Sequence, residues 1–174
     1  CLRARAGMTH LDDWDALGQR LSASGSVRFE EVRVGPDEVL GEVGEEPYST
    51  MVTPGIQLGF CNLYLGLAQG ALEHARRVLL ARRGSWFLSG VERYADDVLV
   101  QRTVGDLVAR ISALEAFADR WNTEYDDVMS LGGRLTAGDR TRAEVGIAQL
   151  TVVATETALD VAQRVFEVTG SSSA

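Results

Sequence analysis

Three long stretches with an apolar period of about 3.6 residues dominate the chain, at residues 55–83, 98–131 and 137–168. Apolar residues repeating at this spacing predict amphipathic α-helices. Short connections between helices of this length predict an antiparallel up-down helical bundle. Three such helices usually need a fourth helix or a partner subunit to complete their core, and we expect the last helix of the bundle to be missing from this chain.

The apolar positions predict which face of each helix is buried. Thr136 and Asp139 have the spacing of an N-cap residue with an acidic N3 partner, which places a helix start there. The first helix is expected to bury Ile56, Phe60, Leu63, Leu67, Ala71, Ala75, Val78 and Leu79. The third is expected to bury Val145, Ile147, Leu150, Val153, Ala154, Ala158, Val161, Val165 and Phe166.

The first 40 or so residues favour β-structure instead. Apolar residues alternate from Val27 and then change phase at Val32, which predicts a bulge or tight bend at Glu30-Glu31. We therefore expect a mainly α protein in three parts. These are the end of a middle β-domain over residues 1–41, a linker loop over residues 42–54, and an incomplete helical bundle domain over residues 55–174.

Composition excludes several classes of partner. The net charge of −8 argues against nucleic acid, because phosphate binding needs a basic face. No apolar run reaches the roughly 20 residues that span a bilayer, so no membrane association is expected. Cys1 and Cys61 are too few for a disulfide framework, which favours a reduced, cytoplasmic setting.

Motifs for catalysis by the chain itself are missing from the sequence. A di-metal site in a bundle needs Glu-x-x-His pairs, but His74 directly follows Glu73 and His10 lies in the β segment, so no metal is expected. No nucleophile elbow, Walker loop or dinucleotide fingerprint occurs either. The residues alone predict a β segment followed by a helical bundle, and leave the catalytic residues unknown.

One stretch differs in composition from the helical segments, with a Trp and three serines around two glycines: "DDWDALGQRLSASGSVRF", Asp12–Phe29. Together with "PDEVLG", "NLYLGLAQGALEHAR" and "VFEVTG", it resembles the acyl-CoA dehydrogenase superfamily. More narrowly, it is similar to the flavin-dependent, dibenzothiophene monooxygenase-like branch. The resemblance covers essentially the whole chain and implies the end of a β-barrel-like domain followed by the C-terminal helical domain. No Glu lies between Pro47 and Glu73, where some dehydrogenases place their base, and this favours the monooxygenase branch.

The resemblance also implies an activity. Reduced FMN, supplied by a separate flavin reductase, would form a C4a-hydroperoxide that transfers one oxygen to a small aromatic or sulfur-containing substrate. The helical domain would build a homo-oligomer, a tetramer in this superfamily. The general acid or base would lie outside this chain, so the chain alone is expected to be inactive. Two alternatives stay open: a dehydrogenase that uses FAD on acyl-CoA, and a non-catalytic oligomerisation module of the same fold.

Candidate site residues follow from the resemblance. Trp14 would stack near the flavin ring, or else be a buried anchor where the β-domain meets the helical bundle. Ser24 and Ser26 would hydrogen-bond the flavin or its phosphate, or else cap a plain turn. Arg102 would reach the flavin phosphate of a neighbouring subunit, a task that suits a guanidinium fork. Arg20 is expected to pair with nearby acids. Trp86 and Phe87 would line the substrate pocket, or else pack under their own loop.

Overall fold

The structure is a computed structural model that describes residues 5–41, 44–82, 84–85 and 87–170. The chain divides into two compact units, Cys1–Val43 and Gly44–Ala174. The first contains the β-structure and the second the helices. Each unit is described by itself.

The first unit is built on a two-stranded antiparallel sheet. Strand β1 (Met8–His10) pairs with β2 (Val27–Phe29), so that residue 8 lies opposite residue 29. The long connection between them contains a short 3-10 helix, Arg20–Ser22. The bend expected after β2 is confirmed: the strand ends at Phe29, and Glu31 has a φ of 50°. Further along, Glu38 accepts hydrogen bonds from the guanidinium of Arg5.

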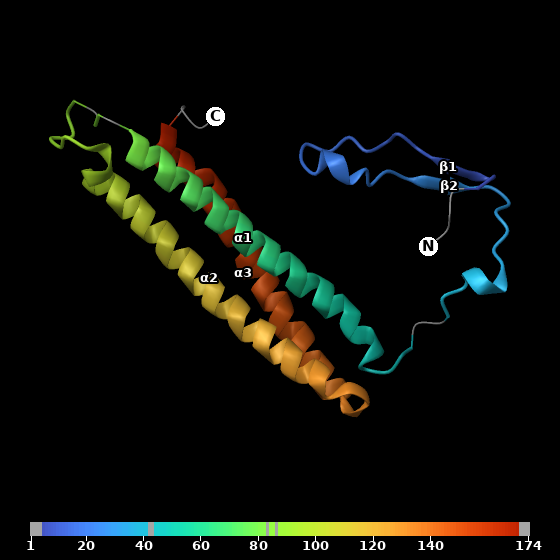
Figure 1. Ribbon diagram of the computed structural model, residues 1–174. Helices are drawn as coiled ribbons and strands as arrows, with labels where there is room; N and C mark the ends of the chain where they lie inside the picture. Colours follow the sequence, from blue (N-terminus) through green and yellow to red (C-terminus); the bar gives the residue numbers. More distant parts are fainter. Residues whose placement is uncertain (1–4, 42–43, 83, 86, 171–174) are drawn as a thin grey trace. The chain divides into compact units, whose positions relative to one another are not determined.

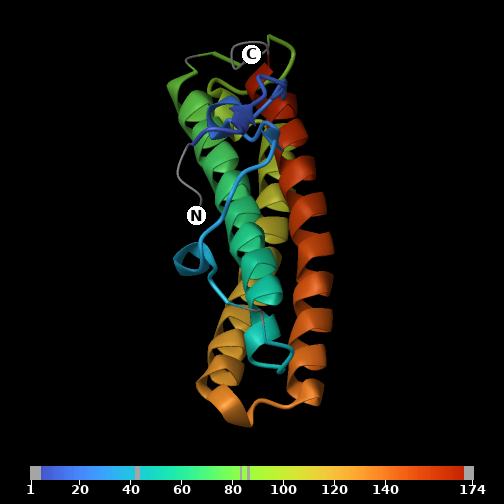
Figure 2. The same cartoon turned by 90° about the vertical axis from the view of Figure 1, so that its right-hand side faces the viewer.

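The second unit is a bundle of three long helices: α1 (Val52–Ala81), α2 (Val98–Ser130) and α3 (Ala137–Thr169). In both views α2 runs antiparallel to α1 and α3, and all three lie side by side (Figures 1 and 2). The up-down bundle predicted from the sequence is thus confirmed. α1 differs from the expected residues 55–83: it begins three residues earlier, at Val52, and ends two residues earlier, at Ala81. Pro54 fits there because a first-turn residue donates no intrahelical hydrogen bond.

Side chains set the starts of α2 and α3. Asp97 accepts a hydrogen bond from the backbone N–H of Leu99 at 2.8 Å and caps α2. The predicted capping box of α3 is confirmed: Thr136 Oγ1 accepts from the N–H of Asp139 at 3.2 Å, and Asp139 accepts from the N–H of Thr136 at 3.1 Å. These bonds satisfy helix N–H groups that have no partner within the helix, and so fix where each helix begins.

The core follows one stripe on each helix. Trp121 of α2 packs directly over Gly146 of α3, where a side chain on the glycine would overlap the indole ring. Asn62 of α1 and Asn122 of α2 exchange hydrogen bonds at 2.9 and 3.0 Å and join the two helices by a polar pair. The least exposed side chains of the main core cluster are Cys61, Ala68, Ala75, Leu107, Leu114, Ala118, Ile147, Leu150, Ala154, Val161 and Val168.

The expected buried face is wrong for the first half of α1. Ile56 is 57% exposed, and Phe60, Leu63 and Leu67 are exposed with it. The side chains buried there are Leu58, Cys61, Leu65 and Ala68. On α3 the same holds for Val145, Val153 and Phe166, which are exposed. Both helices are apolar around much of their circumference, so periodicity did not decide which apolar face meets the other helices.

Within the described residues, α3 is long and apolar enough to cross a membrane, judged by length and composition only. Its most apolar window of 18 residues has a mean hydropathy of 1.3. The same helix contributes fully buried residues, such as Ile147 and Leu150, to the core with α1 and α2. A core helix of a bundle has these properties too, so the expected lack of membrane association stays a prediction.

Candidate functional site

The segment between β1 and β2 encloses a hollow of about 240 Å³ within the first unit. Two predicted site residues, Trp14 and Ser26, line it, and Ser24 does not. The complete lining is His10, Leu11, Asp12, Trp14, Arg20, Ala23, Gly25 and Ser26. The structure thus brings an indole, a guanidinium and a serine together on one irregular loop.

Trp14 is held by its polar edge. The indole N–H donates to the carbonyl oxygen of Gln19 at 3.1 Å, and the side chain is 39% exposed. Because its only hydrogen-bond donor is used within the loop, Trp14 offers a ligand its ring face. Both assignments of Trp14, to a flavin and to the junction with the bundle, therefore stay predictions.

The two candidate serines have different surroundings. Ser24 donates its hydroxyl to Ser22 Oγ at 2.9 Å, and Ser22 donates in turn to the carbonyl of Gln19 at 2.7 Å. The hydroxyl of Ser24 thus belongs to the loop's own network. Ser26 lines the hollow, and its backbone N–H donates to Asp13 Oδ1 at 2.7 Å.

Arg20 lies in the same hollow and differs from expectation. Among the residues that the structure describes, no carboxylate forms an ion pair with it. Of the acids near it in the sequence, Asp13 accepts a hydrogen bond from Ser26. Arg20 thus brings a guanidinium that is in no ion pair into a hollow that Asp12 also lines.

Arg102 lies in the first turns of α2 and lines a second hollow of about 380 Å³ with Leu99, Thr103, Asp106 and Arg164. The other cation in this hollow is already neutralised. Arg164 donates to Asp106 and lies 3.4 Å from Glu167. Hydrogen bonds from Arg164 and Arg110 lower the pKa of Asp106, as expected of a carboxylate kept ionised by guanidinium partners.

Arg102 itself has no such partner. It is exposed, and in the described part of the chain no hydrogen bond or ion pair engages its guanidinium. A cation at this end of a helix gains nothing from the helix dipole, which favours negative charge there. Arg102 is therefore free to bind an anion from outside this bundle.

The two residues expected to line a substrate pocket, Trp86 and Phe87, follow α1 in the sequence. Trp86 falls outside the described residues. Phe87 is 83% exposed and lines none of the hollows described here. Both assignments therefore stay predictions.

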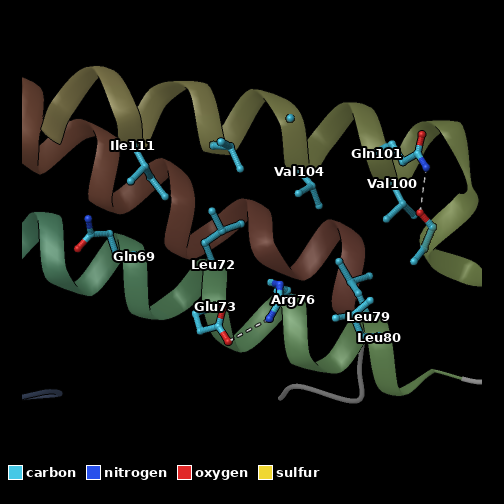
Figure 3. A pocket seen from close by; sticks show the side chains of 13 residues that line it. Gln69, Leu72, Glu73, Arg76, Leu79, Leu80, Val100, Gln101, Val104 and Ile111 are labelled. Atoms are coloured by element: carbon cyan, nitrogen blue, oxygen red, sulfur yellow. Dashed lines mark hydrogen bonds and ion pairs between the residues drawn. The ribbon is translucent and has the colours of Figure 1, made fainter. Parts of the chain in front are cut away.

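A groove between α1 and α2 was not predicted from the sequence (Figure 3). It measures about 530 Å³, and its floor is apolar, with Leu72, Val104 and Ile111 pointing into it. Its rim carries Glu73 and Arg76, whose charged groups lie 3.5 Å apart. The sequence does contain the apolar stripes of both helices that line the groove. It does not show whether a third element covers those stripes, and a groove forms only where none does.

No group of three or more histidine, cysteine, aspartate or glutamate side chains that could hold a metal ion occurs in the described parts of the chain. His74 is exposed on α1. The site chemistry available from these residues is thus aromatic stacking, hydrogen bonding and anion binding.

Comparison with protein families gives a match over residues 58–174 to the acyl-CoA dehydrogenase C-terminal domain. The chain belongs to this family. The predicted family is thereby confirmed, and the three helices of the bundle lie almost entirely within the matched range.

This acyl-CoA dehydrogenase-type chain is similar to several monooxygenases. It is 34% identical over 97% of its length to dibenzothiophene monooxygenase of Rhodococcus erythropolis, and covers 42% of that protein. It is 34% identical over 96% of its length to a probable FMNH2-dependent monooxygenase of Pseudomonas putida, and covers 43% of it.

A solved structure matches equally well. The crystal structure of an FMN-bound protein, TdsC from Paenibacillus sp. A11-2, superposes with a TM-score of 0.89 at 33% identity. The match covers 97% of this chain and 44% of that one. The chain thus spans less than half the length of the relatives it matches.

Proposed function

We propose that this chain forms part of an FMN-dependent monooxygenase that transfers one oxygen atom from dioxygen to a small substrate. The observation that carries the proposal is the similarity of nearly the whole chain to monooxygenases, one of which was solved with FMN. Since the similarity includes residues before the helical domain, it extends to the loop that carries Trp14.

The residues present fit FMN. Its phosphate needs a cation without a competing carboxylate, and Arg102 meets that condition while Arg164 beside it does not. A guanidinium donates two parallel hydrogen bonds to a phosphate, which makes the interaction strong and directional. Arg102 would therefore bind the phosphate of the FMN that a neighbouring subunit holds, and would fix that end of the cofactor.

The hollow of the first unit fits a flat ring. Trp14 would stack on the isoalloxazine with the ring face that its bond to Gln19 leaves available. Gly25 would let the backbone come close to the cofactor, and Ser26 would donate or accept a hydrogen bond at the ring's edge. Reduced FMN, when bound, supplies the electrons that activate dioxygen, and the protein's task is to hold it and exclude water.

The printed names of the relatives support the nature of the partners. Dibenzothiophene is aromatic and contains sulfur, and we propose a substrate of this kind for the present protein. Dependence on FMNH2 in a relative supports a separate flavin reductase that delivers reduced FMN. We place the protein in the cytoplasm, where the buried thiol of Cys61 would stay reduced.

Exposed apolar faces support assembly into a homotetramer through the helical domain. On α3, four exposed apolar side chains recur every seven residues: Val145, Val152, Leu159 and Phe166. The face of α1 that carries Ile56 and Phe60 is exposed as well. Burial of such faces between copies would remove apolar surface from water. The groove between α1 and α2 would be covered by a fourth helix, which completes the domain.

The test is the affinity of the full-length protein for FMN and for riboflavin, measured with Arg102→Ala. If the guanidinium binds the phosphate, the dissociation constant for FMN rises about tenfold or more, because a charged hydrogen bond is lost. Riboflavin, which lacks the phosphate, binds both proteins equally. Arg77→Ala, which removes another exposed helix arginine, serves as the matched control. An unchanged dissociation constant for FMN in Arg102→Ala refutes the assignment.

A further inference from the structure

The loop that carries Trp14 is closed by one carboxylate. Asp13 Oδ1 accepts a hydrogen bond from the backbone N–H of Ser26 at 2.7 Å, across a separation of 13 residues. On the other side of the same contact, the N–H of Leu11 donates to the carbonyl of Ser26 at 2.8 Å. The two halves of the loop are therefore joined at Ser26, directly beside Trp14.

Packing at Gly25 shows how closely the two halves approach. A Cβ atom on Gly25 would lie 2.8 Å from the carbonyl oxygen of Leu11 and 2.9 Å from Asp13 Oδ1. Both distances are shorter than real contacts of that kind, so the backbone of one half touches the other with no room for a side chain. The carboxylate of Asp13 thus lies at the point of closest approach.

The rest of the loop adopts a conformation that local preference does not favour. Gln19 and Ala23, on either side of the short 3-10 helix, have φ values of 52° and 46°. Each non-glycine residue in this region costs roughly 1–2 kcal/mol, and such residues persist only where other contacts hold them. The contacts available are the bonds to the carbonyl of Gln19 from Trp14 and Ser22, and the bond from Ser26 to Asp13.

Asp13 acts here as an acceptor of hydrogen bonds. In the described residues no arginine or histidine forms an ion pair with it. Its hydrogen bond from the Ser26 N–H lowers the pKa of the carboxyl group, which agrees with an ionised acceptor. Asp12, its neighbour, lines the hollow, whereas Asp13 accepts a hydrogen bond from Ser26, a residue of the lining.

We propose that Asp13 is the positioning residue of the flavin-facing hollow, because its bond to Ser26 sets the distance between that residue and the ring of Trp14. This inference rests on the proposed function in so far as the ligand is a flavin. Asp13 would act through Trp14 and Ser26 and would not itself touch the cofactor. An acceptor at this position is required, and a negative charge is not.

The test compares Asp13→Ala with Asp13→Asn in the full-length protein. Asparagine keeps an acceptor oxygen at the same place, and alanine removes it. We expect Asp13→Ala to raise the dissociation constant for FMN by about tenfold, in line with the loss of the hydrogen bond that orders the site. Asp13→Asn should stay within about threefold of the wild type, because a neutral acceptor retains most of the geometry. Asp15→Ala and Asp15→Asn form the matched pair in which no such difference is expected, because Asp15 is an exposed acid of the same loop that does not line the hollow.

A second measurement, made without flavin, tests the hydrogen bond from Ser26 to Asp13 (the clamp) separately from ligand binding. Hydrogen exchange of the Ser26 amide should be faster in Asp13→Ala than in the wild type and in Asp13→Asn. Equal FMN affinity in Asp13→Ala and the wild type overturns the proposal, as does an Asp13→Asn protein that binds as weakly as Asp13→Ala. A wild-type protein that binds no FMN refutes the proposed function and the flavin role of the clamp, while the exchange rates still decide whether the clamp itself exists.

Discussion

Replacement of Gly146 by alanine tests how the bundle core is packed. In most helix interiors this change is favourable by about 1 kcal/mol, because glycine is a poor helix former. At residue 146 the added Cβ would coincide with the six-membered ring of Trp121, a side chain that is only 5% exposed. A rigid indole in a close-packed core has no free space to move into.

The expected magnitude follows from these two opposing terms. Overpacking of a core costs roughly 1–3 kcal/mol, and the overlap with ring atoms here places Gly146→Ala near the upper end of that range. After subtraction of the helix-propensity gain, we expect the free energy of unfolding to fall by about 2 kcal/mol. Gly66→Ala is the matched control, since a Cβ on Gly66 in α1 would meet no atom within 4 Å. It should raise the free energy of unfolding by about 0.5–1 kcal/mol.

The assay is urea unfolding followed by helical circular dichroism at equilibrium. Trp121→Leu in the Gly146→Ala background should recover part of the loss, because it opens the space that the new methyl group needs. If Gly146→Ala is as stable as the wild type, or shifts in the same direction as Gly66→Ala, the described packing of α2 against α3 is wrong.

Three further predictions concern single contacts. The hydrogen bond from Arg5 holds the pKa of Glu38 at about 2, below its ordinary 4.5. The contribution of this pair to stability is therefore complete above about pH 4.5 and is lost as the pH falls through about 2. An NMR titration of Glu38 with a midpoint at 4.5 or higher would refute the pairing. Asn122→Ala removes both hydrogen bonds between the two amides, while Asn62 keeps its bond to the carbonyl of Leu58; it should lower the free energy of unfolding by about 1–2 kcal/mol, whereas replacing both residues by leucine should restore most of it. Arg20→Gln should weaken the binding of reduced FMN, whose ring is anionic at neutral pH, more than that of oxidised FMN; equal weakening of the two forms would show that this cation does not face the ring.

The sequence predicted the helices well where local signals act. Residues 98–131 and 137–168 agree with α2 and α3 to within a residue at each end, because caps such as Thr136 with Asp139 depend only on near neighbours. The burial of Ile56 and Phe60 was predicted wrongly because α1 is apolar on more than one face. Which face meets a neighbour depends on tertiary packing, and on surfaces supplied from outside this chain.

In the candidate site, too, local sequence signals did not predict features that depend on tertiary contacts. Trp14 and Ser26 were selected by family resemblance, and periodicity offered no reason to place them in one hollow. Asp13 was not selected, because its role depends on a contact with a residue 13 positions away, which leaves no local pattern. Arg20 was expected to pair with an acid because several acids lie near it in the sequence. That expectation failed because proximity in the sequence does not show where a side chain points.

Isotope labelling tests most directly whether the protein transfers oxygen with reduced FMN. The full-length protein would be supplied with reduced FMN, dibenzothiophene and ¹⁸O₂, and the product analysed by mass spectrometry. We expect one ¹⁸O atom to be added to the substrate in each turnover, with dependence on Arg102. Unchanged dibenzothiophene, together with FAD-dependent desaturation of an acyl-CoA, would contradict it and assign the protein to the dehydrogenases.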